Sequence, residues 1–140
     1  MARPVFANAQ AILVDYLRPT LAGLTDPVLS GLIVGTKVPA TRTLDGPPLL
    51  VVRRSGGPAE TPILDRPRLD FLVWHETEFR ATAVANIVRS LLLYDLPGQV
   101  HDDHVVYRPV EFSGPTAYPD PAGSATPIVM FTVEVRIRVL

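Results

Sequence analysis

Apolar side chains alternate with polar or longer ones along residues 129–139. The apolar positions are Val129, Phe131, Val133, Val135, Ile137 and Val139, and the positions between them are Met130, Thr132, Glu134, Arg136 and Arg138. Successive side chains of a β-strand point to opposite faces, so this repeat predicts one strand with a core face and a face that is wet or paired. It is the strongest periodic signal in the chain, and it requires a sheet buried on at least one side.

Two other segments carry the helical repeat. Over residues 5–24, apolar side chains recur at helical spacing, and Pro19 is expected to kink or end the helix. Over residues 76–93, one apolar stripe predicts the clearest helix of the chain, with Thr77 as its N-terminal cap. Both segments are therefore interpreted as helices with one face on a core.

Apolar runs bounded by glycine and proline predict the remaining strands. These runs cover residues 32–38, 49–54, 68–74 and 105–112, and Pro109 in the last of them suggests an edge strand or a bulge. Residues 55–67 contain two glycines and three prolines and are expected to form a loop longer than a tight hairpin needs.

The order of these elements is helix, three strands, helix, two strands. It predicts an α+β fold, with a mainly antiparallel sheet of about five strands and two helices packed on one face. No repeat or linker divides the sequence, so residues 1–140 are expected to form a single domain.

The amino-acid composition argues against several kinds of site and several classes of function. The chain has 140 residues and no cysteine, which excludes disulfides, thiolate nucleophiles and cysteine-based zinc sites. Its formal net charge of −1 lacks the basic excess that is usual in nucleic-acid binders. No apolar run is long enough to cross a bilayer, so we expect a soluble, non-secreted protein.

Few residues are of a type and spacing that suggest a catalytic or metal-binding site. His101 to His104 enclose Asp102 and Asp103, which are metal-ligand residue types, but a solvated turn is the preferred interpretation because adjacent side chains diverge. His75 is interpreted as a structural residue at a helix boundary. The sequence has no Walker A loop, G-x-G-x-x-G or H-E-x-x-H motif, so we expect no catalytic, cofactor-binding or metal site and no enzyme activity.

Arginine is the prominent charged residue, with twelve copies against one lysine. Arg53 and Arg54 precede Ser55-Gly56-Gly57, which could form an anion-binding nest. Adjacent strand residues point to opposite faces, however, so interface ion pairs are the favoured interpretation. Glu134, Arg136 and Arg138 share a face and suggest a charge ladder across strands or subunits, with a solvated sheet face as the alternative.

Several stretches also resemble one protein family. They are residues 51–58 (VVRRSGGP), 64–74 (LDRPRLDFLVW), 110–115 (VEFSGP), 118–121 (YPDP) and 131–135 (FTVEV). In their order and spacing, over roughly residues 5–140, they are similar to tail terminator proteins of siphophages that infect actinobacteria. The individual motifs consist of common residue types.

The resemblance implies a small α+β virion protein that assembles in the host cytoplasm as a homo-oligomer, a hexameric ring in the neck between head and tail. Such a ring caps the last ring of tail tube protein, stops polymerisation and binds the head-completion (stopper) protein. DNA passes through its channel without sequence-specific binding, and the ring needs no cofactor and no membrane. The alternatives are another neck component, such as a stopper or head–tail adaptor, or a small ligand-binding or hydrolase domain.

A hypothesis about the assembly interface follows from the charged positions around the loop and the last strand. A closed ring needs two different patches on each subunit. The residues assigned to these patches are Arg53, Arg54, Gly56, Gly57, Asp65, Arg66, Glu134, Arg136 and Arg138.

Overall fold

The computed structural model describes residues 3–40, 42, 46–119 and 125–140 as an α+β domain. Its helices are α1 (Ala9–Ala22) and α2 (Glu78–Ser90), with a 3₁₀ turn at Pro27–Leu29 and a π turn at Leu91–Asp95 that continues α2. Its strands are β1 (Ile33–Gly35), β2 (Leu49–Arg54), β3 (Leu64–Asp65), β4 (Arg68–Trp74), β5 (Val100–His101), β6 (His104–Val106), β7 (Val110–Ala117), β8 (Ile128–Glu134) and β9 (Ile137–Val139).

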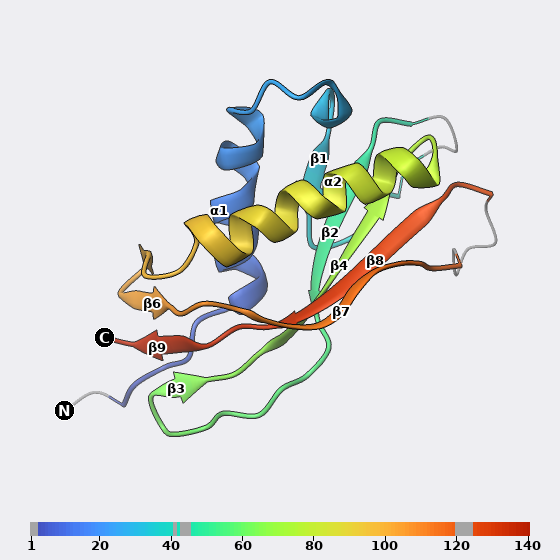
Figure 1. The fold of residues 1–140 in the computed structure, drawn as a ribbon. Coiled ribbons are helices and arrows are strands. Elements are labelled where there is room, and N and C mark those ends of the chain that lie inside the picture. The colour runs from blue at the N-terminus through green and yellow to red at the C-terminus, as the bar shows by residue number, and fades with distance from the viewer. Residues whose placement is uncertain (1–2, 41, 43–45, 120–124) are drawn as a thin grey trace.

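The strands form two sheets in place of the single sheet predicted from the sequence. The larger has the order β1-β2-β4-β8-β7 and is antiparallel except for the β1–β2 pair, and the smaller has the antiparallel order β3-β9-β6-β5. Figure 1 shows α1 and α2 on one face of the larger sheet and the smaller sheet at its lower end. The predicted fold class and the helices on one face are confirmed.

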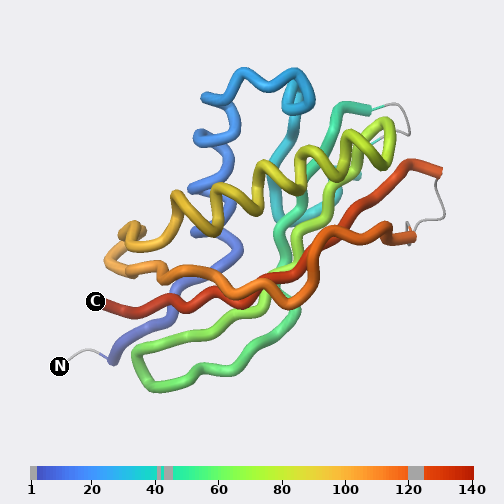
Figure 2. Tube along the Cα trace, in the orientation of Figure 1, coloured from blue at the N-terminus to red at the C-terminus, as the bar shows by residue number. Residues whose placement is uncertain are grey.

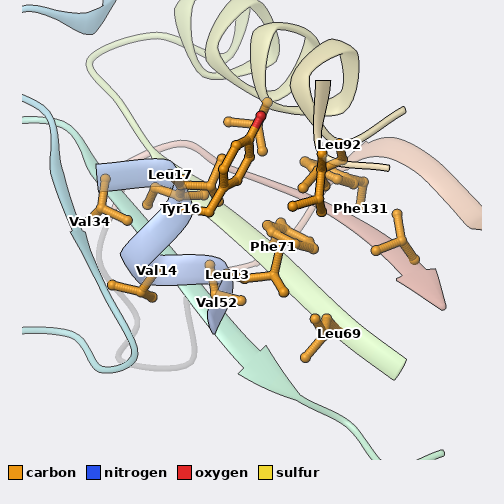
Figure 3. Close-up of a cluster of buried hydrophobic side chains, with 14 of the residues drawn as sticks. Leu13, Val14, Tyr16, Leu17, Val34, Val52, Leu69, Phe71, Leu92 and Phe131 are labelled. Carbon is orange, nitrogen blue, oxygen red and sulfur yellow. The ribbon is translucent and has the colours of Figure 1, made fainter. Parts of the chain in front are cut away.

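The main core lies between the two helices and the larger sheet (Figure 3). Phe71 of β4 and Phe131 of β8 stack at its centre, with ring centroids 4.8 Å apart and planes 4° apart. Both are fully buried, and Leu13, Leu17 and the neighbouring strand residues surround them. An offset aromatic pair of this kind contributes about 1 kcal/mol beyond its buried area.

A second apolar cluster covers part of the opposite face of the sheet. It contains Leu49, Val51, Leu72, Trp74 and Ile128, and Tyr118 and Met130 pack against it. At the other end of this face the apolar residues give way to Arg53, Asp70 and Thr132, which are aligned across β2, β4 and β8. The sheet is therefore buried on both faces at one end and polar on one face at the other.

The helix predictions differ from the structure at their ends. Thr77 caps α2 as predicted, since its hydroxyl accepts a hydrogen bond from the Arg80 N–H. Pro19 does not end α1, which continues to Ala22. Proline removes one backbone hydrogen bond from a helix, and the burial of Leu17 and Leu21 holds the last turn of α1 on the core.

Two strand predictions were wrong in the same way. The predicted strand at 105–112 is split by Pro109 into β6 and β7, because proline donates no hydrogen bond to a ladder. The predicted strand at 129–139 is divided at Val135 and Arg136 into β8 and β9, opposite Pro67 in the neighbouring segment. The expectation of an edge strand with a bulge is confirmed for β7, whose pairing with β8 shifts register twice.

The remaining differences concern segments with little regular structure. The predicted strand at 32–38 is reduced to Ile33–Gly35, and the predicted loop at 55–67 contains β3. Asp120 and Pro121, part of one stretch of the family resemblance, lie outside the described residues. Among the described residues, no helix has the length and apolarity needed to cross a membrane.

Candidate functional site

The residues assigned to the assembly interface gather at one end of the molecule. They lie at the end of β2, along residues 55–67, at the end of β8, between β8 and β9, and in β9. We call residues 55–67 the arm, since this segment extends below the larger sheet and returns beside β9 (Figures 1 and 2). The arm has a defined shape, because β3 pairs with β9 and Thr61 forms a bridge with Leu64.

Arg54 and Asp65 fasten the two ends of the arm to each other. The Arg54 guanidinium donates to both carboxylate oxygens of Asp65, at 2.9 and 3.1 Å, and to the carbonyl oxygens of Gly56 and Gly57, at 3.0 and 2.7 Å. The Asp65 side chain is 6% exposed and also accepts from the Arg66 N–H. A bidentate pair with a buried carboxylate fixes the relative orientation of the two side chains and is stronger than a single hydrogen bond. Arg54 is therefore the residue that gives the arm its shape.

Gly57 allows the backbone at the start of the arm to approach the backbone of residues 66–68 at its end. Its φ is +92°, and a Cβ atom at this position would lie 2.2 Å from the Arg66 carbonyl oxygen and 2.7 Å from the Arg68 nitrogen. Gly56 also has a positive φ, of +108°, but a Cβ there would meet nothing within 4 Å. Only glycine fits at Gly57 without a shift of the backbone.

Two more ion pairs connect the arm to the C-terminal strands. Arg66 Nε lies 2.9 Å from Glu134 Oε1, although its N–H is not aligned for a hydrogen bond. Arg136 Nε lies 3.6 Å from a Glu60 carboxylate oxygen, and both side chains are well exposed. The sequence predicted a charge ladder of Glu134, Arg136 and Arg138. The structure pairs the first two with residues of the arm, and Arg138 makes no ion pair with any described residue.

Arg53 points away from Arg54, as the strand geometry predicted, and belongs to a second network. It lies 3.4 Å from Asp70, whose other carboxylate oxygen accepts from Thr132 at 2.8 Å and from Ser55 at 3.2 Å. Asp70 is buried, and it was not among the site residues predicted from the sequence. A lone carboxylate in the middle of an apolar strand was the signal, because such a group needs partners from its neighbours.

The histidines have structural partners. The His75 Nδ1 accepts from the Glu76 N–H at 2.8 Å, so Nε2 carries the proton and donates to the Val28 carbonyl at 3.0 Å. Asp102 and Asp103 form the turn between β5 and β6, both with positive φ. Among the described residues, no group of three or more histidine, cysteine, aspartate or glutamate side chains is placed to hold a metal ion.

Two partly buried polar contacts join α1 to the π turn after α2, and α2 to β7. The Tyr16 hydroxyl donates to Asp95 at 2.6 Å, and burial, together with this hydrogen bond, raises the Tyr16 pKa. Arg89 of α2 donates to Glu111 of β7 at 3.0 Å. That hydrogen bond lowers the pKa of Glu111.

The surface formed by the described residues includes two hollows of about 450 and 550 Å³, the size of a small-ligand site. One, of about 450 Å³, lies beside His75 and Glu76 at the end of β4. The other, of about 550 Å³, lies between the arm, β9 and the segment before β7 and is lined by Arg108, Arg136 and Arg138. Both are open to solvent. Arg108 was not among the residues that the sequence analysis assigned to a site.

Phe79 was also missed. It is 86% exposed on α2, the highest value among the large apolar side chains of the described residues. Its signal was present in the sequence, since Phe79 falls off the apolar stripe formed by Ala81, Val84 and Val88. An aromatic side chain on the wet side of an amphipathic helix is a candidate for contact with a partner.

Comparison with known proteins adds no assignment. No family model matches the sequence, and no curated protein matches it.

Proposed function

We propose that this protein is a structural component of a phage virion, a tail terminator. In this role it forms a ring at the head-proximal end of the tail tube, stops tube polymerisation and joins the tail to the head-completion (stopper) protein. The proposal begins from the sequence resemblance, which runs through five separate stretches. Four of these stretches contribute β2, β4, β7 and β8, which lie side by side in one sheet.

The observation that carries the proposal furthest is the arm. Ordering a loop of this length costs conformational entropy, and long ordered loops in compact domains are usually functional. Here Arg54, Asp65 and Gly57 hold it in one conformation outside the helix-covered sheet. A fixed projection with charged sides is suited to a contact between subunits, because little further ordering is needed when it binds.

The proposed role as a tail terminator also implies a closed ring and a channel for DNA. A ring closes when two different patches on each subunit meet head to tail. The chain has a formal net charge of −1, and passage of DNA through the channel requires no base-specific contact. The ring would act by position alone, in the neck of the virion, with the tube protein on one side and the stopper protein on the other.

The test is an assembly assay with the purified chain and the tail tube protein of the same phage. Light scattering after size exclusion gives the mass of the chain alone, and electron microscopy gives the distribution of tube lengths. We expect a hexamer-sized particle, alone or on tube ends, and tubes that stop growing once it is added. A stopper or adaptor would leave tube growth unchanged, which separates these neck components from a terminator.

A chain that stays monomeric and leaves tube growth unchanged would refute the proposal. A matched pair of variants tests the contribution of the arm. Arg66→Glu breaks the pair with Glu134, whereas Arg66→Glu combined with Glu134→Arg restores an intrachain pair with the charges exchanged. If Arg66 and Glu134 act only within the subunit, the double variant recovers ring formation, and if they contact a neighbour it does not.

A further inference from the structure

The hollow beside β9 has an unusual combination of side chains. We call it the arginine groove, and it is bounded by Ile63 of the arm, Tyr107 and Val110 before and in β7, and the arginines 108, 136 and 138. The three apolar side chains are partly or largely exposed. Exposed apolar and aromatic groups next to arginine are typical of the centre of a protein interface.

Two of the three arginines have no partner among the described residues. Arg136 pairs with Glu60, but the guanidinium groups of Arg108 and Arg138 make no ion pair or hydrogen bond with any described residue. The groove therefore presents two free planar cations above an apolar surface. Its complement is a segment with an apolar side chain and an adjacent carboxylate, since arginine binds carboxylates through two parallel N–H groups.

The start of α2, at the opposite end of the folded molecule, carries such a segment. Phe79 projects from the first turn of α2, and Glu78 beside it makes no ion pair with any described residue. Glu76, one residue before the cap, pairs with Arg80 and is 73% exposed. Figure 1 places the start of α2 and the strands β3 and β9 at opposite ends of the molecule.

We infer that Phe79 of one copy inserts into the arginine groove of the next copy, with Glu78 facing Arg108 and Arg138. The two surfaces differ in shape and charge, and their separation on one chain prevents Phe79 from reaching its own groove. Such a contact is heterologous, and its repetition closes a ring or extends a filament. The inference rests on the proposed function and gives it a subunit contact.

The first experiment uses the lack of cysteine in the chain. Phe79→Cys and Val110→Cys are introduced together, and a short bismaleimide is added to the concentrated protein. We expect covalent dimers, trimers and larger species, whereas either single variant forms at most dimers. The control combines Phe79→Cys with Tyr94→Cys, because Tyr94 is as exposed as Phe79, at 81%, but lies beyond the opposite end of α2. Higher species from the control as abundant as those from the 79 and 110 pair would overturn the inference.

The second experiment measures assembly of surface variants by light scattering. Phe79→Asp and the double variant Arg108→Glu with Arg138→Glu should each lose the ring, while Tyr94→Asp should keep it. A mixture of the two defective proteins retains one intact surface on each, so it should form dimers and stop there. Loss of a central aromatic contact weakens an interface by about 30-fold or more. Rings of unchanged mass from both defective variants would overturn the inference.

The two proposals fail in different ways. If the wild-type chain forms rings and caps tubes but the 79 and 110 cysteines give no higher species, the groove contact is wrong and the terminator function stands. If the chain gives the cross-linked series but leaves tube growth unchanged, the function is refuted and the contact stands.

Discussion

Replacement of Gly57 by alanine should destabilise the protein by about 2–5 kcal/mol. The positive φ of Gly57 costs a non-glycine residue about 1–2 kcal/mol. The added Cβ would also lie 2.2 Å from the Arg66 carbonyl oxygen, so the two sides of the arm must separate, and overpacking of this kind costs about 1–3 kcal/mol. Separation of the two sides would also stretch the hydrogen bond from the Arg68 N–H to the Gly56 carbonyl oxygen, which is 2.9 Å long.

Gly56 supplies a matched control. It also has a positive φ, but a Cβ there meets nothing within 4 Å, so Gly56→Ala should cost only the conformational part, about 1–2 kcal/mol. Urea denaturation measures both variants, with fluorescence of the single tryptophan, buried Trp74, as the signal. For a slope of about 2 kcal/mol/M, the midpoint of Gly57→Ala should lie roughly 0.5–1.5 M below that of Gly56→Ala. Equal midpoints would refute the close approach deduced for the arm.

Three further predictions concern the body of the domain. Because the hydrogen bond from Arg89 lowers the Glu111 pKa, its stabilisation is present above the unfolded pKa of about 4.3 and is lost as the pH falls through the lowered folded pKa. Wild type should therefore exceed Glu111→Gln by up to about 1 kcal/mol at pH 7 and by nothing near pH 2, and a constant gap in urea titrations would contradict this. Tyr16→Phe removes a hydrogen bond to Asp95 and should cost about 1–2 kcal/mol in the same assay, and no change would show that the contact is not formed in solution. Acrylamide should quench Trp74 poorly in the native state and efficiently in urea, since its side chain is buried, and equal quenching in both would contradict that placement.

The sequence predicted correctly those helices and strands whose local sequence signals agree with the tertiary structure. The strands 49–54 and 68–74 were placed with their observed bounds, and Thr77 identified the start of α2. The two strands are mainly apolar runs that follow Pro48 and Pro67, so the sequence itself marks where they begin. Their local preferences also agree with the tertiary structure, which is the condition for a sequence pattern to be informative.

The smaller sheet could not be predicted, because its strands have only two or three residues. Leu64–Asp65 and Val100–His101 are too short to show alternation, and their pairing depends on contacts distant in sequence. The division between β8 and β9 was hidden for another reason. Side chains continue to alternate through Val135 and Arg136, so the period does not reveal that the backbone leaves one sheet for the other.

The structure brings the residues of the interface hypothesis close together, and their ion-pair partners were not predicted from the sequence. Charge and turn residues were enough to bring Arg54, Asp65 and Gly57 to one place. The identity of each ion pair was not accessible, because many arginines and carboxylates compete, and only the register of the arm selects Asp65 for Arg54 and Glu134 for Arg66. Arg108 has no counter-charge among the described residues, which the sequence could not show, whereas the position of Phe79 off the apolar stripe of α2 was visible in it.

The position of β8 has a consequence for synthesis on the ribosome. This strand lies between β4 and β7, yet it is translated after both of them. Until it emerges, the nascent chain exposes two unpaired strand edges and the side of the Phe71 ring that Phe131 later covers. Such edges favour association between chains, so this risk is greatest in the interval before β8 is made.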